Sequence, residues 1–119
     1  MEKINLRAKL VSNDNNIVID ISGVKTKNKI IYKEGNINVT ILIFDNKIEM
    51  YRTSDKYKIN LVFDTLNDTI STYNVFDISR IIYLKTNTKK LSISDNEIII
   101  EYNLEGNDFY YCLNIGGKI

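Results

Sequence analysis

Hydrophobic and polar residues alternate along almost the whole chain with a period of two. The segment from Lys3 to Leu10 is a clear case, since its aliphatic residues occupy the even positions and its charged and amide residues the odd ones. Successive side chains of a β-strand point to opposite faces, so this pattern predicts strands with one buried and one solvated face. The alternation recurs over residues 17–22, 29–33, 37–43, 48–52, 57–63, 69–75, 80–88, 91–94, 98–104 and 109–115.

Turn-forming residues separate these segments. Asp45-Asn46, Asn67-Asp68 and Asp95-Asn96 each stand between two apolar runs. Short Asn and Asp pairs of this kind are typical of tight turns. No segment sustains the i, i+3, i+4 spacing of a helix, although residues 74–80 could form one helical turn. We therefore expect about nine or ten short strands in a single domain that spans residues 1–119.

A chain of many short strands joined by tight turns has two common solutions, a closed barrel and a two-sheet sandwich. The succession of hairpins with few long connections favours an all-β, closed antiparallel up-and-down β-barrel. Closure also removes the free edges that would make isoleucine-rich strands prone to aggregate. The β-sandwich remains the alternative.

Charge and composition narrow the classes of function. The chain carries 16 basic and 15 acidic residues, a net charge of +1, so it lacks the basic excess by which proteins bind nucleic acid. The N-terminus alternates instead of forming the apolar block of a secretory signal, and no apolar run approaches the ~18 residues of a membrane-spanning helix. Cys112 is the single cysteine, which excludes an intramolecular disulfide. These features predict a cytoplasmic protein with neither a nucleic-acid nor a membrane partner.

The chain lacks most of the residue types and motifs that enzymes use for catalysis. The chain has no histidine, which removes Ser-His-Asp triads, Cys-His pairs and histidine metal sites. A single cysteine cannot form a CxxC motif, and the five glycines form no phosphate-binding loop. The carboxylates of Glu97 and Glu101 share the polar face of one strand. A solvent-exposed face accounts for charged residues there without a role in acid–base catalysis. Cys112 lacks the cationic neighbours of a reactive thiol. We expect no enzymatic activity, no metal and no cofactor.

Several segments resemble the YwiB-like family of uncharacterised bacterial proteins. They are, in order, KINLRAKLVS, GVKTKNKIIY, IEMYRTSDKYKINLVF, YLKTNTKKL and NEIIIEYNL, followed by a last strand that ends in Gly-Gly. Their order and spacing carry the resemblance across nearly the whole chain, whereas each alone is only a strand pattern. The chain departs from the family at residues 74–77, which read Asn-Val-Phe-Asp where the family has an aromatic-Gly pair. The resemblance implies a lipocalin-like (calycin) barrel with a ligand pocket, but no activity to carry over.

Arg52 is the candidate of most chemical interest. It shares strand parity with Ile48 and Met50, which points its guanidinium toward the inside of the predicted barrel. A buried guanidinium is costly unless it is paired, and at a barrel mouth it could bind an anionic ligand bidentately. A strand-end arginine that reaches solvent, or a structural ion pair that closes the barrel, explains the same pattern and is the commoner case.

Four further inward residues complete the predicted ligand site. Thr86 and Thr88 share the face of the apolar residues that precede them, and lumen hydroxyls can orient a ligand. Tyr102 lies between two inward aliphatic residues and needs a partner for its hydroxyl if it is buried, and Tyr73 is placed similarly. For all four, ordinary strand packing is the alternative.

Two functions follow from these expectations. The first is a cytoplasmic lipocalin-like barrel that binds a small molecule in its lumen, with an anionic group of that molecule facing Arg52. The second is a non-enzymatic protein-interaction or structural module whose lumen is filled by its own bulky side chains. A homo-oligomer is an expected form of such a module. The sequence neither identifies the ligand nor decides whether the lumen is open.

Overall fold

The described residues form one closed barrel of ten antiparallel strands. The computed structural model describes residues 2–13 and 15–118, and the strand order around the barrel is β1-β10-β9-β8-β7-β6-β5-β4-β3-β2. Each strand pairs with its neighbour in sequence and the first pairs with the last, so the predicted up-and-down barrel is confirmed. The strands are β1 (Glu2–Ser12), β2 (Asn15–Lys25), β3 (Lys29–Glu34), β4 (Ile37–Ile43), β5 (Lys47–Thr53), β6 (Tyr57–Asp64), β7 (Thr69–Val75), β8 (Arg80–Ile93), β9 (Glu97–Leu104) and β10 (Asn107–Lys118).

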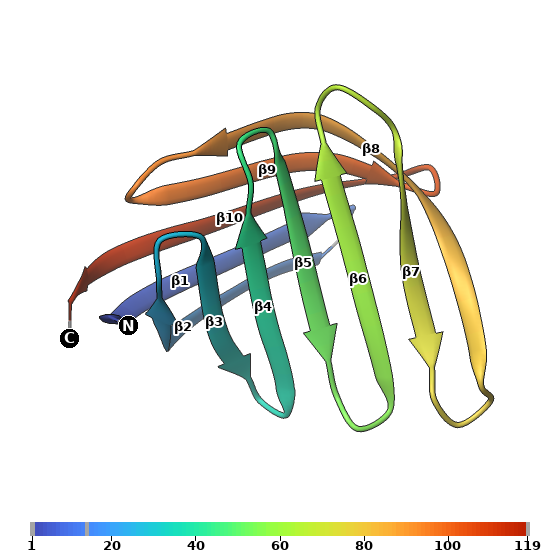
Figure 1. The fold of residues 1–119 in the computed structure, drawn as a ribbon, viewed down its shortest axis with the longest axis horizontal. Coiled ribbons are helices and arrows are strands. Elements are labelled where there is room, and N and C mark those ends of the chain that lie inside the picture. The colour runs from blue at the N-terminus through green and yellow to red at the C-terminus, as the bar shows by residue number, and fades with distance from the viewer. Residues whose placement is uncertain (1, 14, 119) are drawn as a thin grey trace.

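The barrel is flattened into two crossing layers (Figure 1). β3 to β7 run steeply across the front of the view, whereas β1, β2, β9 and β10 run across them behind. β8 belongs to both layers, since its first half pairs with β7 and its second half with β9. The sequence pattern predicted two strands here, over 80–88 and 91–94. That break is wrong, because a β-bulge between Thr88 and Lys90 lets one bent strand continue.

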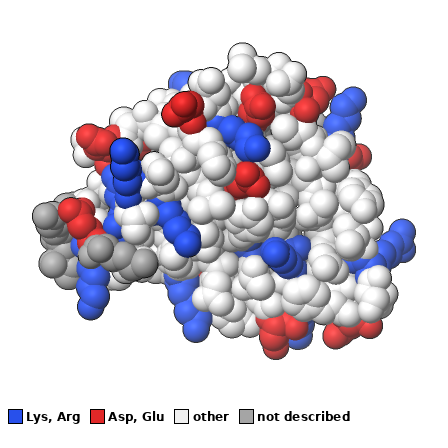
Figure 2. All heavy atoms as spheres, in the orientation of Figure 1, with Lys and Arg blue, Asp and Glu red and all other residues white. Residues whose placement is uncertain are grey.

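Charged side chains of both signs are spread over the surface. Figure 2 shows basic and acidic residues interspersed on the face in view, with no continuous area of one sign there. Among the described residues, no helix is long and apolar enough to cross a membrane. Recognition on the face in view therefore depends on local groups rather than on a broad electrostatic field.

The core lies between the two layers and is built by the inward residues of the alternating strands. Complete burial of an aliphatic or aromatic side chain contributes roughly 1.5–3 kcal/mol. In β2, β7 and β8, the buried side chains among the described residues are only Ser71, Thr86 and Thr88. The other strands supply the buried apolar side chains, which include Ile4, Leu6, Ile30, Val39, Ile41, Ile48, Met50, Phe63, Ile98, Ile100 and Leu113.

Two pairs of neighbouring strands, here called seams, are joined by few backbone pairs. At the β2–β3 seam, pairing covers only Gly23–Lys25 and Ile30–Tyr32. At the β6–β7 seam, it covers only Tyr57–Asn60 and Thr72–Val75. Beyond these short ladders the neighbouring strands diverge, so their backbone groups cannot bond to one another. Side chains must therefore fill the space and satisfy those groups.

Gly23 permits the close approach of strands at the β2–β3 seam. A Cβ atom at this position would lie 2.6 Å from Leu6 Cδ1 and 2.7 Å from the carbonyl oxygen of Ile31. The second contact is with backbone, which cannot rotate away as the end of a side chain can. The seam therefore depends on the absence of a side chain at this position.

A methyl group at this glycine should weaken the seam. We expect Gly23→Ala to lower the unfolding free energy by about 1–3 kcal/mol, because overpacking against backbone pushes the strands apart. Urea unfolding followed by circular dichroism measures the change. Ser22→Ala, at the exposed neighbouring position, is the control and should alter stability by less than about 0.5 kcal/mol. A Gly23→Ala variant as stable as the wild type would contradict this packing.

Candidate functional site

A small cavity of about 140 Å³ opens at one end of the barrel, where β2 leaves β3. The backbone ladder between these strands ends at Gly23, so the earlier part of β2 faces the ends of β3 and β5 across a gap. The walls combine aliphatic side chains with an arginine, a glutamate and a tyrosine. The lining residues are Ala8, Lys9, Leu10, Ile17, Ile19, Glu34, Met50, Arg52 and Tyr111.

Arg52 on β5 forms an ion pair with Glu34 on β3 at the wall of this cavity. Arg52 Nη2 donates to Glu34 Oε2 at 2.6 Å, and the two side chains are 21% and 30% exposed. Burial alone would lower the pKa of Arg52, but the charge and hydrogen bond of Glu34 outweigh it, and the pKa is raised. Both sequence interpretations of Arg52 meet here, because the guanidinium closes an ion pair and also lines a cavity.

Two tyrosine hydroxyls bridge the lumen beside this pair. Tyr32 on β3 and Tyr111 on β10 share a hydrogen bond of 3.0 Å between their hydroxyl oxygens. Burial raises the pKa of Tyr32 and, more strongly, that of Tyr111, while the charge of Arg52 acts against both shifts. Both phenols therefore stay neutral near pH 7, and each can donate or accept a hydrogen bond near the cavity.

The predicted ligand residue Thr86 belongs to a hydrogen-bond chain across the β6–β7 seam. The N–H of Val62 donates to Ser71 Oγ at 3.1 Å. The hydroxyls of Ser71 and Thr86 are 2.7 Å apart, and Thr86 Oγ1 donates to the carbonyl of Leu84 at 3.1 Å. Since the one hydroxyl proton of Thr86 goes to Leu84, Ser71 is the donor to Thr86. The chain replaces the missing backbone ladder with side-chain bonds.

Thr88 on β8 makes a second link, directly to β6 beside this seam. Its Oγ1 accepts a hydrogen bond of 3.1 Å from the backbone N–H of Asp64 on β6. Thr69 adds a third link by donating from its hydroxyl to the carbonyl of Val62. The inward hydroxyls of Thr86 and Thr88 are thus bonded to the protein and do not line the cavity. Their role in ligand binding stays a prediction.

Tyr102 and Tyr73 pack against other aromatic rings. The ring centroid of Tyr102 lies 4.6 Å from that of Phe63 and 5.1 Å from that of Phe109, on which it stacks. Burial raises the pKa of Tyr102 to about 12. Tyr73 is half-buried, with its ring centroid 5.7 Å from that of Tyr57. Neither tyrosine lines the cavity, and their role in ligand binding also stays a prediction.

Of the five predicted ligand residues, all of which are described, Arg52 alone lines the cavity. Sequence reasoning missed Glu34 and Tyr32, which lie beside Arg52. Strand parity could have indicated both, because they share the even positions of β3 with buried Ile30 and so lie on its inward face. No sequence signal places Glu34 against Arg52, since β4 stands between their strands.

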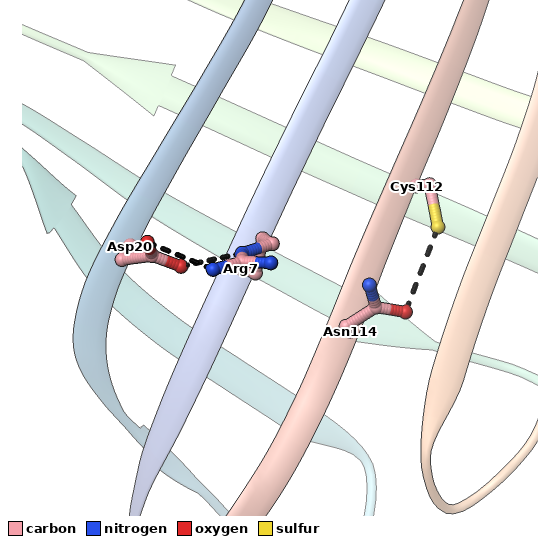
Figure 3. Close-up of polar contacts among 4 residues, drawn as sticks. All are labelled: Arg7, Asp20, Cys112 and Asn114. Atoms are coloured by element: carbon pink, nitrogen blue, oxygen red, sulfur yellow. Dashed lines mark hydrogen bonds and ion pairs between the residues drawn. The ribbon is translucent and has the colours of Figure 1, made fainter.

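A larger groove of about 610 Å³ runs along the outside of β2, β1 and β10 and includes Arg7, Asp20 and Asn114. Figure 3 shows Arg7 and Asp20 directed toward each other, with Cys112 bonded to Asn114 nearby. Nε and Nη2 of Arg7 donate to the two carboxylate oxygens of Asp20 at 2.7 and 3.2 Å, and both side chains are more than half exposed. This guanidinium is already engaged bidentately in solvent, so the groove offers an anion less than Arg52 does.

Removal of the Thr88 hydroxyl should weaken the β6–β7 seam. Thr88→Val keeps the shape of the side chain but leaves the Asp64 N–H without its acceptor, which costs about 1–3 kcal/mol of unfolding free energy. Thr72→Val is the control, because Thr72 faces outward on β7 and its hydroxyl makes no hydrogen bond within the described chain. Chemical denaturation compares the two variants, and equal stabilities would show that Thr88 does not bridge the seam.

The raised pKa of Tyr102 makes stability fall in alkaline solution. The unfolded chain ionises this residue near the ordinary pKa of 10.0, whereas the folded chain does so only near a pKa of about 12. The folded state holds the proton more tightly, so this contribution is complete below pH 10.0 and is lost as the pH rises to about 12. Over that range the unfolding free energy should fall less steeply in Tyr102→Phe than in the wild type. An unchanged slope in Tyr102→Phe would count against the assignment.

Comparison with known proteins agrees with this architecture. No curated protein matches the chain at a significant level. The crystal structure of the ywiB protein from Bacillus subtilis matches with a TM-score of 0.72 at 21% sequence identity, over 98% of this chain and 92% of that one. This likeness shows the fold alone. The model of a family described as a domain of unknown function, DUF1934, matches residues 4–114. The resemblance to the YwiB-like family is thereby confirmed, and the chain belongs to the DUF1934 family.

Proposed function

We propose that the barrel binds a small molecule with a carboxylate group in the cavity at Arg52. The observation that supports this function is a cationic guanidinium, only 21% exposed, at the wall of a largely aliphatic cavity. Apolar pockets with a few convergent polar groups are the usual form of a small-molecule site. In this proposal Glu34 holds the guanidinium in place until a ligand anion joins or replaces it.

The chemistry of Arg52 leaves room for a second anion. A guanidinium has five N–H donors in a planar fork, and the ion pair with Glu34 uses one terminal nitrogen. A carboxylate can accept two parallel hydrogen bonds from such a fork. Tyr111 lines the same cavity and offers a hydroxyl. These groups suit a monoanion better than a neutral ligand.

The volume of the cavity limits the size of the ligand. At 140 Å³ it is close to the ~150 Å³ of an apolar cavity that holds one benzene ring. Sites for drug-sized ligands have volumes of about 300 Å³ or more. The aliphatic side chains of Ala8, Leu10, Ile19 and Met50 suit a compact apolar body. We therefore assign the site to a monocarboxylate with one ring or a short branched chain.

An interaction module is the second candidate function. The lumen away from the cavity is filled by the protein's own side chains, and Ile30, Ile41, Ile48 and Ile98 are completely buried there. A barrel packed in this way needs no ligand for stability. This function becomes the better explanation if no small acid binds at Arg52.

The proposal is one of binding and includes no catalytic step. Cys112 is free and buried, and burial raises the pKa of its thiol, which disfavours the reactive thiolate. Within residues 2–13 and 15–118, no cluster of His, Cys, Asp or Glu could hold a metal ion. A cytoplasmic location is part of the same proposal, with the free thiol as its support.

Benzoate tests this site, since it joins one carboxylate to one ring. Isothermal titration calorimetry should detect binding to the wild type with a Kd of roughly 0.1–1 mM. Arg52→Met should weaken binding by about tenfold or more, because a hydrogen bond to a charged group contributes about 1.5–3 kcal/mol. Arg7→Met removes an exposed arginine of the outer face instead, and this matched control should bind like the wild type.

Two further controls separate binding from folding and charge from shape. The double variant Arg52→Met, Glu34→Gln removes both charges of the pair, so no carboxylate is left unpaired, and it should also fail to bind. Benzamide, a neutral analogue of the same shape, should bind the wild type more weakly than benzoate does. The proposal is wrong if benzoate does not bind the wild type, or if it binds Arg52→Met equally well.

A further inference from the structure

Two strands of the barrel have a free edge along part of their length. β9 pairs with β8 only from Thr86 onward, so residues 80–84 have β7 on one side and, within the described chain, no strand on the other. β2 is likewise free on the side opposite β1 before Gly23. Free backbone donors and acceptors on a strand edge can pair with another chain, unless charged residues or bulges prevent it.

The backbone groups of Ile81 and Tyr83 point to the free side of β8. The carbonyl of Lys85 accepts a hydrogen bond from the N–H of Glu105, on the side away from β7. In an antiparallel strand the N–H and C=O of one residue point to the same side, and alternate residues share that side. Ile81 and Tyr83 alternate with Lys85, so they present their N–H and C=O groups at the edge, whereas Ile82 faces β7.

The surface around this edge is apolar. Ile78, Ile81 and Tyr83 are 62%, 49% and 66% exposed. The stretch from 77 to 84 carries only one acidic and one basic residue. The free edge of β2 carries Asp20 in its middle, and a charged residue there is a common defence against pairing, whereas the one charged residue of the β8 edge, Arg80, lies at its end. The β8 edge has the features of a pairing edge, and the β2 edge does not.

We propose that residues 80–84 of β8 pair antiparallel with the same residues of a second copy of this chain. Because Ile81 and Tyr83 hold the free groups, the register that bonds both of them places Ile81 opposite Tyr83 of the second copy. The two-fold axis then lies at Ile82. An aromatic residue opposite a β-branched one is a favourable cross-strand pair, so the edge is complementary to itself.

The charges agree with a second copy as the partner. In this register Arg80 stands opposite Leu84, and no like charges face each other. Lys85 of each copy stands opposite Ser79 of the other copy, two residues from Asp77, so the charges nearest each other at both ends are of opposite sign. A foreign strand would find no cluster of charge on this edge to select it.

Sedimentation of the full-length protein over about 5–500 µM tests the proposal. The wild type should show a reversible monomer–dimer equilibrium in this range. Ile81→Lys places an ammonium group opposite Tyr83 twice in each dimer and should weaken association by about tenfold or more. Val18→Lys puts the same charge on the β2 edge, at a position that is 50% exposed, and should associate like the wild type. A wild type that stays monomeric, or an Ile81→Lys variant that dimerises equally well, overturns the proposal.

A cysteine at the proposed axis tests the register. Two copies of Ile82 would face each other as a non-hydrogen-bonded pair, whose Cα separation of about 4.5 Å lies within the range of a disulfide. In a Cys112→Ser background, Ile82→Cys should give a covalent dimer after equilibration in a glutathione buffer, and Val18→Cys should not. No cross-link at position 82, or equal cross-linking of the two variants, rules out this register.

Discussion

Closure of a meander from two crossing layers is the constraint on which the rest of this structure depends. At the β2–β3 and β6–β7 seams, neighbouring strands diverge and the backbone ladder is short. Each buried N–H or C=O without a partner costs about 1–3 kcal/mol, so such places need other partners. At the β6–β7 seam, Ser71, Thr86 and Thr88 supply them. At the β2–β3 seam, Gly23 lets the strands meet, and the gap beside it becomes the cavity at Arg52.

This constraint divides the inward polar groups into two sets. The threonine hydroxyls of β8 are hydrogen-bonded to other groups of the protein, so they help to close the barrel. The guanidinium of Arg52 faces a cavity and uses one nitrogen in its ion pair with Glu34, so it retains donors for a ligand. The same shortage of strand partners leaves the first half of β8 with a free edge. The proposed binding at the cavity and the proposed pairing at the edge thus rest on two separate consequences of one geometry.

Features that depend on local sequence could be predicted. The strands follow from the alternation, and the inward direction of Arg52 follows from its parity with Met50. Features that depend on how distant strands approach could not. Thr88 reaches Asp64 because β7 begins only opposite Thr86, so that β8 meets β6 directly beyond it, and Glu34 reaches Arg52 across an intervening strand. The continuity of β8 could not be predicted either, because a bulge and a turn interrupt the alternation of apolar and polar residues in the same way.

The division of the inward polar groups is tested most directly by a residue-resolved NMR titration of isotope-labelled protein with benzoate, in which the arginine Nε–H signals are followed together with the backbone amides. The account predicts the largest shift changes at Arg52, Glu34 and Tyr111, which line the cavity, with the signals of Thr86 and Thr88 unaffected. An unmoved Arg52 signal, or largest changes at the two threonines, would contradict it.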